Sequence, residues 1–348
     1  MPRSERSGKV QTVLGLIRPE SLGVTLTHEH LLIDLKLIHQ PPEEASERAW
    51  VDAPVTMDRL GAMAKRTHHS IPNTRLLDVE TATEEILRYK HAGGTSLVDA
   101  TAIGAGRDPL ALARISRATG LNIVMGGSHY TPLSYPPDMD QRSEDSIFQR
   151  IVRDVTVGVG DTGVRSGIIG EVGNFWPMTE VQGRVLRASA RAQVVTGAAI
   201  LIHPGAHPKS PMAILDVLVK AGARPERIII GHLDLFHEPK VFKDISQAGC
   251  YLEWDVFGYE DTSWDEFVLF ASDVERMERL ERLITDGYGD RLVVAQDVCL
   301  HIHQRKYGGK GYAHILENIV PRMRKRGFTE KNINAILVDN PKRILTFE

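Results

Sequence analysis

Hydrophobic positions in this chain fall into short runs that are separated by longer amphipathic stretches. From about residue 80 onward, each run is followed by a loop, a helical pattern and a glycine. The runs are apolar and rich in β-branched residues, as expected of strands that are buried on both faces of a parallel sheet. One more run lies near the start, which makes eight: Gly23–His28, Thr95–Asp99, Leu121–Met125, Gly167–Glu171, Ala199–His203, Ile228–His232, Tyr251–Asp255 and Leu292–Asp297.

The stretches between the runs have the start and stop signals of helices. Asp108, followed by proline, opens one helix that Gly120 ends. Thr81 and Glu84 have the spacing of a capping box and predict the start of another helix. Strands and helices that alternate at this spacing are typical of right-handed βα units.

Eight strands alternating with helices predict an α/β protein, specifically a (β/α)₈ TIM barrel. Residues 31–78 do not follow the rhythm, since they contain Pro41, Pro42 and Pro54, and they predict a long first βα loop that could cover the barrel mouth. A doubly wound open sheet is the rival, but no G-x-G-x-x-G motif follows the first run. No linker divides the chain, so residues 1–348 are predicted to form one domain.

The composition narrows the class of protein further. Hydrophobic residues make up 42% and charged residues 25% of the chain, and the net charge is −3, which argues against a nucleic-acid partner. No apolar run is long enough for a bilayer and the first residues show no signal peptide, so no membrane association is expected. Cys250 and Cys299 lie far apart without a motif, which predicts a reduced, cytoplasmic protein.

Candidate chemistry stands where the predicted strands end. The C-terminal ends of all strands of a parallel barrel lie on one face, where active sites of this fold are found. Residues far apart in the sequence should therefore converge there. The candidate metal ligands are His28, His30, Glu171, His203, His232 and Asp297.

The spacing and number of these residues favour two metal ions. His28 and His30 are two residues apart on a strand and can face one ion together, while Glu29 points the other way. Four imidazoles and two carboxylates are the ligands that zinc-like divalent ions prefer, and six ligands exceed one tetrahedral site. Two ions that share a bridging carboxylate are the simplest arrangement. A water between them could lose its proton at neutral pH and attack a substrate.

Other residues in the predicted loops are candidates for the substrate pocket. Tyr130, Phe175 and Trp176 follow strand ends and could form its walls. Arg107 and Lys310 are cations in loops of the same face and could hold an anionic substrate tail. His68, by contrast, is expected to be solvated.

At this point the chain resembles a known family over nearly its whole length. The matching segments are VQTVLGLIRPESLGVTLTHEHLLID, VDATAIGAGRDP, GIIGEVGNFWPMTE, ILIHPG, GHLD, CYLEWDVFG, AQD, YGGKGY and DNPKRILTF. They resemble the phosphotriesterase family of the amidohydrolase superfamily, and most of all its phosphotriesterase-related branch, which includes N-acetyltaurine hydrolases.

The resemblance implies roles for the strand-end residues. It implies that His28, His30 and Asp297 hold a more buried ion, that His203 and His232 hold a more exposed one, and that Asp297 also shuttles a proton. The first-described phosphotriesterases bridge the ions with a carboxylated lysine at the end of the fourth strand, where this chain has no lysine. The related branch uses a glutamate, so the resemblance implies that Glu171 is the bridge. Zinc is the expected metal, with Mn, Co or Fe as alternatives. The resemblance also suggests a homodimer.

The expected activity is hydrolysis of a small amide or ester by a metal-bridging hydroxide. N-acyl amino acids, N-acyl amino-sulfonates and lactones are the candidate substrates. Hydrolysis of a phosphoester or phosphotriester is the alternative, and a ligand-binding barrel without turnover is a third. All six predicted metal ligands are present, which argues against a barrel that only binds a ligand.

Overall fold

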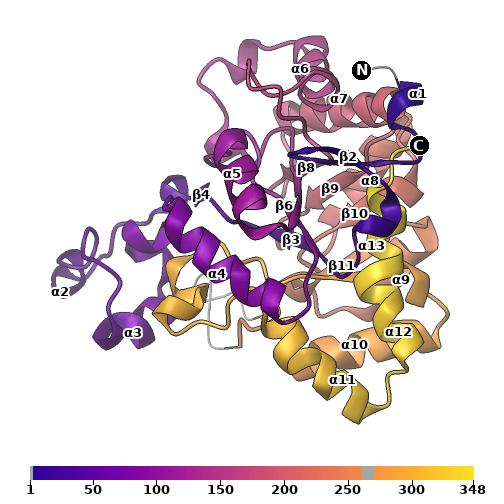
Figure 1. Ribbon diagram of the computed structural model, residues 1–348. Helices are drawn as coiled ribbons and strands as arrows, with labels where there is room; N and C mark the ends of the chain where they lie inside the picture. The colour runs from indigo at the N-terminus through magenta and orange to yellow at the C-terminus, as the bar shows by residue number, and fades with distance from the viewer. Residues whose placement is uncertain (1–2, 261–269) are drawn as a thin grey trace.

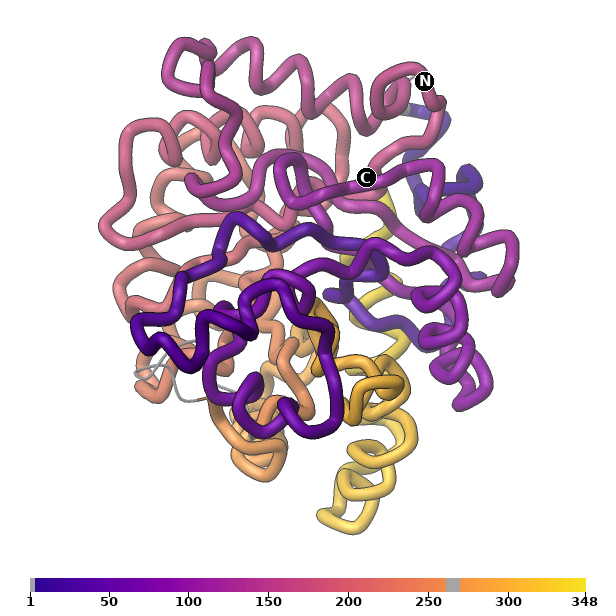
Figure 2. Tube along the Cα trace, turned by 90° about the vertical axis from the view of Figure 1, so that its left-hand side faces the viewer, coloured from indigo at the N-terminus to yellow at the C-terminus, as the bar shows by residue number. Residues whose placement is uncertain are grey.

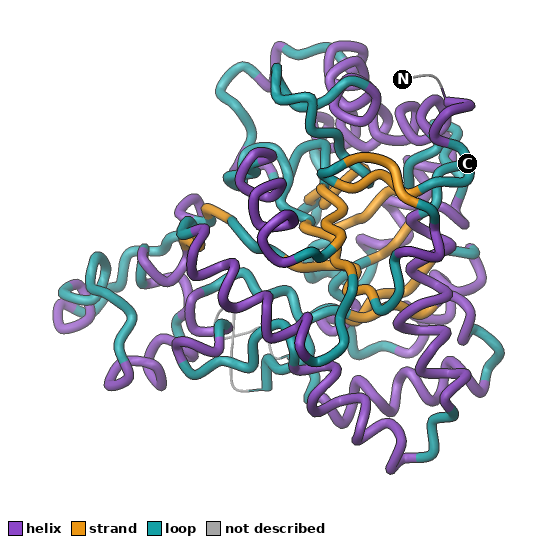
Figure 3. Tube along the Cα trace, viewed as in Figure 1, coloured by secondary structure: helices purple, strands orange, loops and turns teal. Residues whose placement is uncertain are grey.

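The barrel that the hydrophobic runs predict is present. The computed structural model describes residues 3–260 and 270–348. Within these residues, the parallel strands gather at the centre of the molecule and helices surround them (Figure 3). The barrel strands are β3 (Thr25–Glu29), β6 (Ser96–Asp99), β7 (Asn122–Met125), β8 (Ile169–Gly173), β9 (Ile200–His203), β10 (Ile228–Ile230), β11 (Tyr251–Trp254) and β12 (Leu292–Val294).

Two parallel sheets close on each other to make this barrel. One sheet has the order β12-β11-β10-β9-β8 and the other the order β3-β6-β7. Gly127 and Gly170 join β7 to β8 through two backbone hydrogen bonds, with N···O distances of 2.8 and 2.7 Å. On the opposite side the amide of Asp297, just after β12, donates to the carbonyl of His28 on β3 at 3.2 Å. The rival prediction of an open sheet is therefore wrong.

Alternate residues of the strands pack into two different buried clusters. Val98, Leu201, Ile229 and Val293 belong to one cluster, together with Leu22, which precedes the first strand. The residues between them on the strands, such as Leu97 and Ile230, belong to the larger cluster that also contains the buried faces of the helices. This alternation is the period of two that a strand buried on both faces requires.

The helices between the strands form the outer layer (Figure 1). Asp108 caps α5 by accepting a hydrogen bond from the amide of Ala111, and Gly120 ends α5 with φ = 69°, both as predicted. The predicted start at Thr81 is wrong, because Asp78 caps α4 and accepts from the amides of Glu80 and Thr81. The helices that follow barrel strands are α4 (Val79–His91), α5 (Pro109–Thr119), α6 (Glu144–Thr156), α7 (Glu180–Thr196), α8 (Ser210–Lys220), α9 (Pro239–Ala248) and α10 (Asp273–Thr285).

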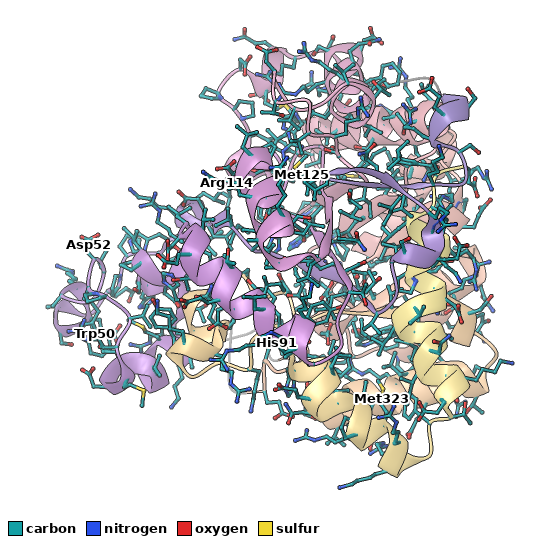
Figure 4. All side chains as sticks on the ribbon, viewed as in Figure 1. Trp50, Asp52, His91, Arg114, Met125 and Met323 are labelled. Atoms are coloured by element: carbon teal, nitrogen blue, oxygen red, sulfur yellow. The ribbon has the colours of Figure 1, made fainter. Side chains whose placement is uncertain are left out.

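The first βα connection is long, as predicted, and runs from the end of β3 to α4. It contains the antiparallel pair β4 (Ile33–Asp34) and β5 (Arg75–Leu76) and the short helices α2 (Ala45–Arg48) and α3 (Leu60–Lys65). Trp50 and Asp52 mark its tip, which projects away from the barrel (Figure 4). Seen from the side, the connection lies across the face of the molecule (Figure 2). It is therefore placed to wall a cavity at that face.

The two ends of the chain meet on the other side of the molecule. The amide of Gly8 donates to the carbonyl of Phe347 at 2.8 Å, beside the hairpin of β1 (Val10–Thr12) and β2 (Gly15–Ile17). The C-terminal helices are α11 (Val320–Arg326), α12 (Glu330–Asn334) and α13 (Asn340–Leu345), and α1 (Arg3–Arg6) begins the described chain. None of the described helices has the length and apolar character needed to cross a membrane.

The side chain of Glu29, at the end of β3, forms hydrogen bonds with the segment that follows β12 and so links the first and last strands of the barrel. The carboxylate is fully buried, and one oxygen accepts from the backbone amide and the side chain of Gln296, at 2.7 and 3.1 Å. The other oxygen accepts from the amide of Val298 at 3.1 Å. Glu29 thus binds the chain on both sides of Asp297, while its neighbours His28 and His30 remain available for other contacts.

We expect Glu29→Gln to destabilise the fold by about 1–3 kcal/mol, because an amide group cannot accept at both positions and leaves a buried N–H unpaired. Urea unfolding of both proteins measures the difference. Glu84→Gln, which changes an exposed carboxylate of α4, is the matched control. A loss of stability no larger than that of the control would contradict this role of Glu29.

Candidate metal centre

The six predicted ligands converge at one end of the barrel. Their ligand atoms form overlapping groups within 4.8 Å of one another: His28 with His30 and Glu171, Glu171 with His203 and His232, and His28 with His232 and Asp297. Glu171 lies within β8, two residues before its end, and the other five lie at or just beyond the C-terminal ends of β3, β9, β10 and β12. Because the C-terminal ends of all parallel strands lie on one face of a barrel, residues more than two hundred positions apart in the sequence meet there.

Glu171 lies between the two pairs of histidines. Its Oε1 is 2.8 Å from Nδ1 of His203 and 2.8 Å from Nε2 of His232. Its Oε2 is 3.6 Å from Nε2 of His28 and 3.9 Å from Nε2 of His30. One carboxylate oxygen therefore faces each pair.

Asp297 completes the side of the centre formed by His28 and His30. Its Oδ1 is 3.2 Å from Nε2 of His30 and 4.0 Å from Nε2 of His28. Asp297 and His232 both adopt the left-handed conformation, with φ of 48° and 52°. This conformation costs energy for residues other than glycine and is typical of functional sites, where the surrounding structure enforces it.

Polar partners hold the second ring nitrogens of His28, His30 and His232. The hydroxyl of Thr101 donates to the carbonyl of Leu32 at 3.0 Å, so it accepts from Nδ1 of His30 at 2.8 Å. This arrangement puts the proton of His30 on Nδ1 and leaves the lone pair of Nε2 facing the centre. Hydrogen bonds of this kind orient metal-binding histidines.

Two further carboxylates, which the sequence reasoning did not select, lie behind the centre. Asp255 Oδ1 is 2.8 Å from Nδ1 of His232, and Asp255 Oδ2 is 3.2 Å from Nδ1 of His28. Glu253 Oε2 is 3.3 Å from the same atom of His28. Both residues end β11, and they form a fourth group with His28. Their spacing of two residues at the end of a predicted strand was the signal that could have found them.

The donor atoms fit divalent metal ions. Nε2 of His28 and Oδ1 of Asp297 are buried and make no hydrogen bond, although both face the centre. Burial alone lowers the pKa of His28, but the carboxylates of Glu171 and Asp255 raise it well above its usual value. Burial raises the pKa of Glu171, but the nearby imidazoles hold it well below its usual range. A divalent cation supplies the positive charge that these carboxylates favour and binds histidine in its neutral form.

Comparison with known proteins agrees with this geometry. The model of the phosphotriesterase family matches residues 8–345. The chain belongs to the phosphotriesterase family. An N-acetyltaurine hydrolase of Xenopus tropicalis is 39% identical over 350 residues, which cover 99% of this chain and 100% of that protein.

Solved structures show the same fold. A resiniferatoxin-binding protein from Rhodobacter sphaeroides has a TM-score of 0.95 and 34% identity, over 98% of this chain and 95% of that one. An organophosphorus hydrolase from Deinococcus radiodurans has a TM-score of 0.77 and 26% identity, over 98% and 97% of the two chains. With the family and the buried cluster of histidines and carboxylates together, this member of the phosphotriesterase family is a metal-dependent hydrolase.

A cavity of about 510 Å³ opens onto the ligands. Tyr130 and Phe175 line it, as expected for pocket walls. Trp176 does not; it stacks on His207 with ring centroids 4.9 Å apart and is 38% exposed. His68, which the sequence suggested to be solvated, is buried and lines the cavity.

The two predicted cations do not face this cavity. The guanidinium of Arg107 is buried, where it binds Asp154 at 2.7 Å and the carbonyl of Gly126 at 3.0 Å. Lys310 lines a separate cavity of about 280 Å³ beside Gly258. Neither residue is therefore placed to bind a substrate tail in this cavity. A buried cation such as Arg107 needs a partner within the fold, and Lys310 lies at the other cavity.

We expect removal of divalent metal to lower the unfolding temperature and abolish hydrolysis of an aryl ester, because the clustered carboxylates lose their counter-charge and binding to the folded state no longer stabilises it. Calorimetry, metal analysis and an esterase assay before and after dialysis against a chelator measure the three effects. Returning Zn²⁺, Mn²⁺ or Co²⁺ should restore them. An unchanged unfolding temperature and full activity with only trace metal would refute the metal centre.

Proposed function

We propose that this chain uses two divalent metal ions to hydrolyse an ester or amide bond, and that its substrate is a small uncharged molecule of the lactone type. The observation that supports the substrate class is the lining of the cavity above the ligands. The proposal that the bond is a carboxylic ester or amide is supported by the N-acetyltaurine hydrolase relative, which matches over the whole chain.

Each proposed ligand has a part in this reaction. His28, His30 and Asp297 would hold one ion, His203 and His232 would hold the other, and Glu171 would be shared between them. The distances of the two Glu171 oxygens to the two histidine pairs support this division. When bound, the ions lower the pKa of a water and polarise the bond under attack. Asp297, which lines the cavity, accepts the proton released from that water.

Tyr130 is suited to assist at the substrate. Its ring lies 5.4 Å from that of His203, and it lines the cavity. Burial, reinforced by the charges of Glu171 and Asp297, raises the pKa of Tyr130 well above its usual value. The phenol therefore stays protonated at neutral pH and can donate a hydrogen bond to the oxygen of the bond under attack.

The walls of the cavity are mostly apolar. The first βα connection supplies several of them, together with the polar side chains of His39, Gln40 and His68, and the described lining residues include no lysine or arginine. The apolar side chains are Ile33, Leu35, Leu37, Ile38, Leu133, Phe175, Leu235, Val256 and Phe270.

This lining distinguishes among the candidate substrates. A sulfonate or carboxylate tail placed against these mostly apolar walls loses its hydration without gaining a lysine or arginine partner among the described residues, which is costly. N-acetyltaurine and N-acyl amino acids have such a tail, whereas a lactone does not. A neutral phosphotriester also fits the same walls, so it is the second candidate.

The bridging role of Glu171 is tested by metal affinity. Glu171→Gln should weaken binding of both ions, because it removes the negative charge that they share. His28→Ala should mainly empty one position and His203→Ala mainly the other. Competition with a coloured chelator measures both affinities, and Glu84→Gln on the exposed face of α4 is the control. A Glu171→Gln protein that loses only one ion would show that this carboxylate does not bridge.

The substrate class is tested by comparing kcat/KM on a lactone, an aryl ester, N-acetyltaurine and paraoxon with one metal. We expect the lactone or ester to exceed N-acetyltaurine by tenfold or more, equivalent to about 1.4 kcal/mol of transition-state stabilisation. Leu37→Lys should raise the ratio of N-acetyltaurine to lactone activity, and Leu37→Met should leave it unchanged. A tenfold preference of the wild-type protein for N-acetyltaurine would refute the neutral substrate, and one for paraoxon would replace the carbonyl reaction by phosphotriester hydrolysis.

A further inference from the structure

A fully buried arginine lies behind the metal centre, on a helix that contributes none of the proposed ligands. Arg276 is in the first turn of α10 and has no exposed surface. Its Nε donates to Oδ1 of Asp234, and one terminal nitrogen donates to Oδ1 of Asp273 at 2.8 Å. A guanidinium cannot lose its charge in a protein, so these two carboxylates are what make its burial tolerable.

Asp234 connects this arginine to the histidines. Its Oδ2 accepts from the backbone amide of Asp255 at 3.0 Å. Asp255 in turn accepts from the backbone amide of His232 at 2.8 Å, and its carboxylate contacts Nδ1 of both His232 and His28. The contacts therefore run from Arg276 through two aspartates to two histidines, all of them buried.

Asp273 extends the same network to the loops beside the centre. Its Oδ1 accepts from the amide of Gly258, which follows β11, at 2.9 Å. Its Oδ2 lies 2.8 Å from Nε2 of His314, in the segment after β12. Arg276 thus holds the end of β11 from two directions, through Asp234 on one side and Asp273 on the other.

We propose that Arg276 is a positioning residue for both metal ions, although it contacts no ligand. Asp255 is the shared element, because it fixes the ring of His28, from one proposed metal position, and the ring of His232, from the other. A carboxylate that fixes the ring of a metal-binding histidine typically contributes ten- to hundredfold to metal affinity. The backbone of Asp255 is held by Asp234, and Asp234 is held in turn by the guanidinium of Arg276. The inference rests on the proposed ligands and is independent of the substrate.

Arg276→Met tests the proposal. We expect the affinity for each of the two ions to fall about tenfold relative to the wild-type protein, and the visible absorption of the Co²⁺-loaded protein to change, because the imidazole geometry is no longer fixed. Competition with a coloured chelator and the Co²⁺ spectrum provide the readouts. Arg276→Lys keeps the charge but not the fixed fork of donors, so it should restore part of the affinity.

Leu280→Ala separates positioning from general stability. Leu280 is buried in the same helix, so its truncation lowers the unfolding temperature without removing any charge of the network. We expect this variant to keep wild-type affinities and the wild-type Co²⁺ spectrum.

Three results would overturn the inference. Arg276→Met with unchanged affinities is one, loss of only one ion is another, and an equal loss of affinity in Leu280→Ala is the third. If Arg276→Met does not fold, Arg276→Lys decides the question. Unchanged metal affinity and an unchanged Co²⁺ spectrum in Arg276→Lys would contradict a role for the guanidinium of Arg276. Failure of the wild-type protein itself to bind two ions would instead refute the proposed centre.

Discussion

The structure depends on how buried negative charge is balanced at one end of the barrel. Glu171, Glu253, Asp255, Asp297 and Asp234 are each at most 4% exposed and lie close together behind and beneath the cavity. An unpaired carboxylate at such a depth costs several kcal/mol, and like charges raise that cost. Imidazoles offset it only when protonated, and then they cannot bind metal. Divalent ions in front of the histidines, as proposed above, would balance the charge together with the permanent guanidinium behind them.

This balance explains the character of the cavity. The carboxylates lie at the floor of the cavity, whereas the walls supplied by the first βα connection are mostly apolar. Reactivity and selectivity therefore come from different parts of the chain. The candidate metal ligands at the floor would supply the reactivity, whereas the shape and polarity of the walls determine which substrate can bind above them. Members of one family can share the floor and differ in the walls, since loops vary while strand ends are fixed by the barrel.

The sequence predicted which side chains converge beneath the cavity, because that signal is local. Each of the six candidate ligands ends a predicted hydrophobic run or closely follows it, and the barrel brings His28, Glu171 and Asp297 together. The walls and the supporting network could not be read in this way. Arg107 is paired with Asp154, forty-seven residues away, and Arg276 with Asp234, forty-two residues away. Such pairs depend on how helices and loops pack, and neither partner is marked by its neighbours in the sequence.

The triplet of residues 28–30 shows that function and folding are joined in one short segment. The outer two residues face the metal centre, and the middle one, Glu29, binds the backbone on both sides of Asp297. Since β3 and β12 are the first and last strands of the barrel, the contact that closes the barrel also sets the position of Asp297 against His30. A change that loosens the closure must therefore move a ligand. Conversely, a metal ion held by Asp297 and the two histidines, as proposed, would bind both strands and so stabilise the closure on which its own site depends.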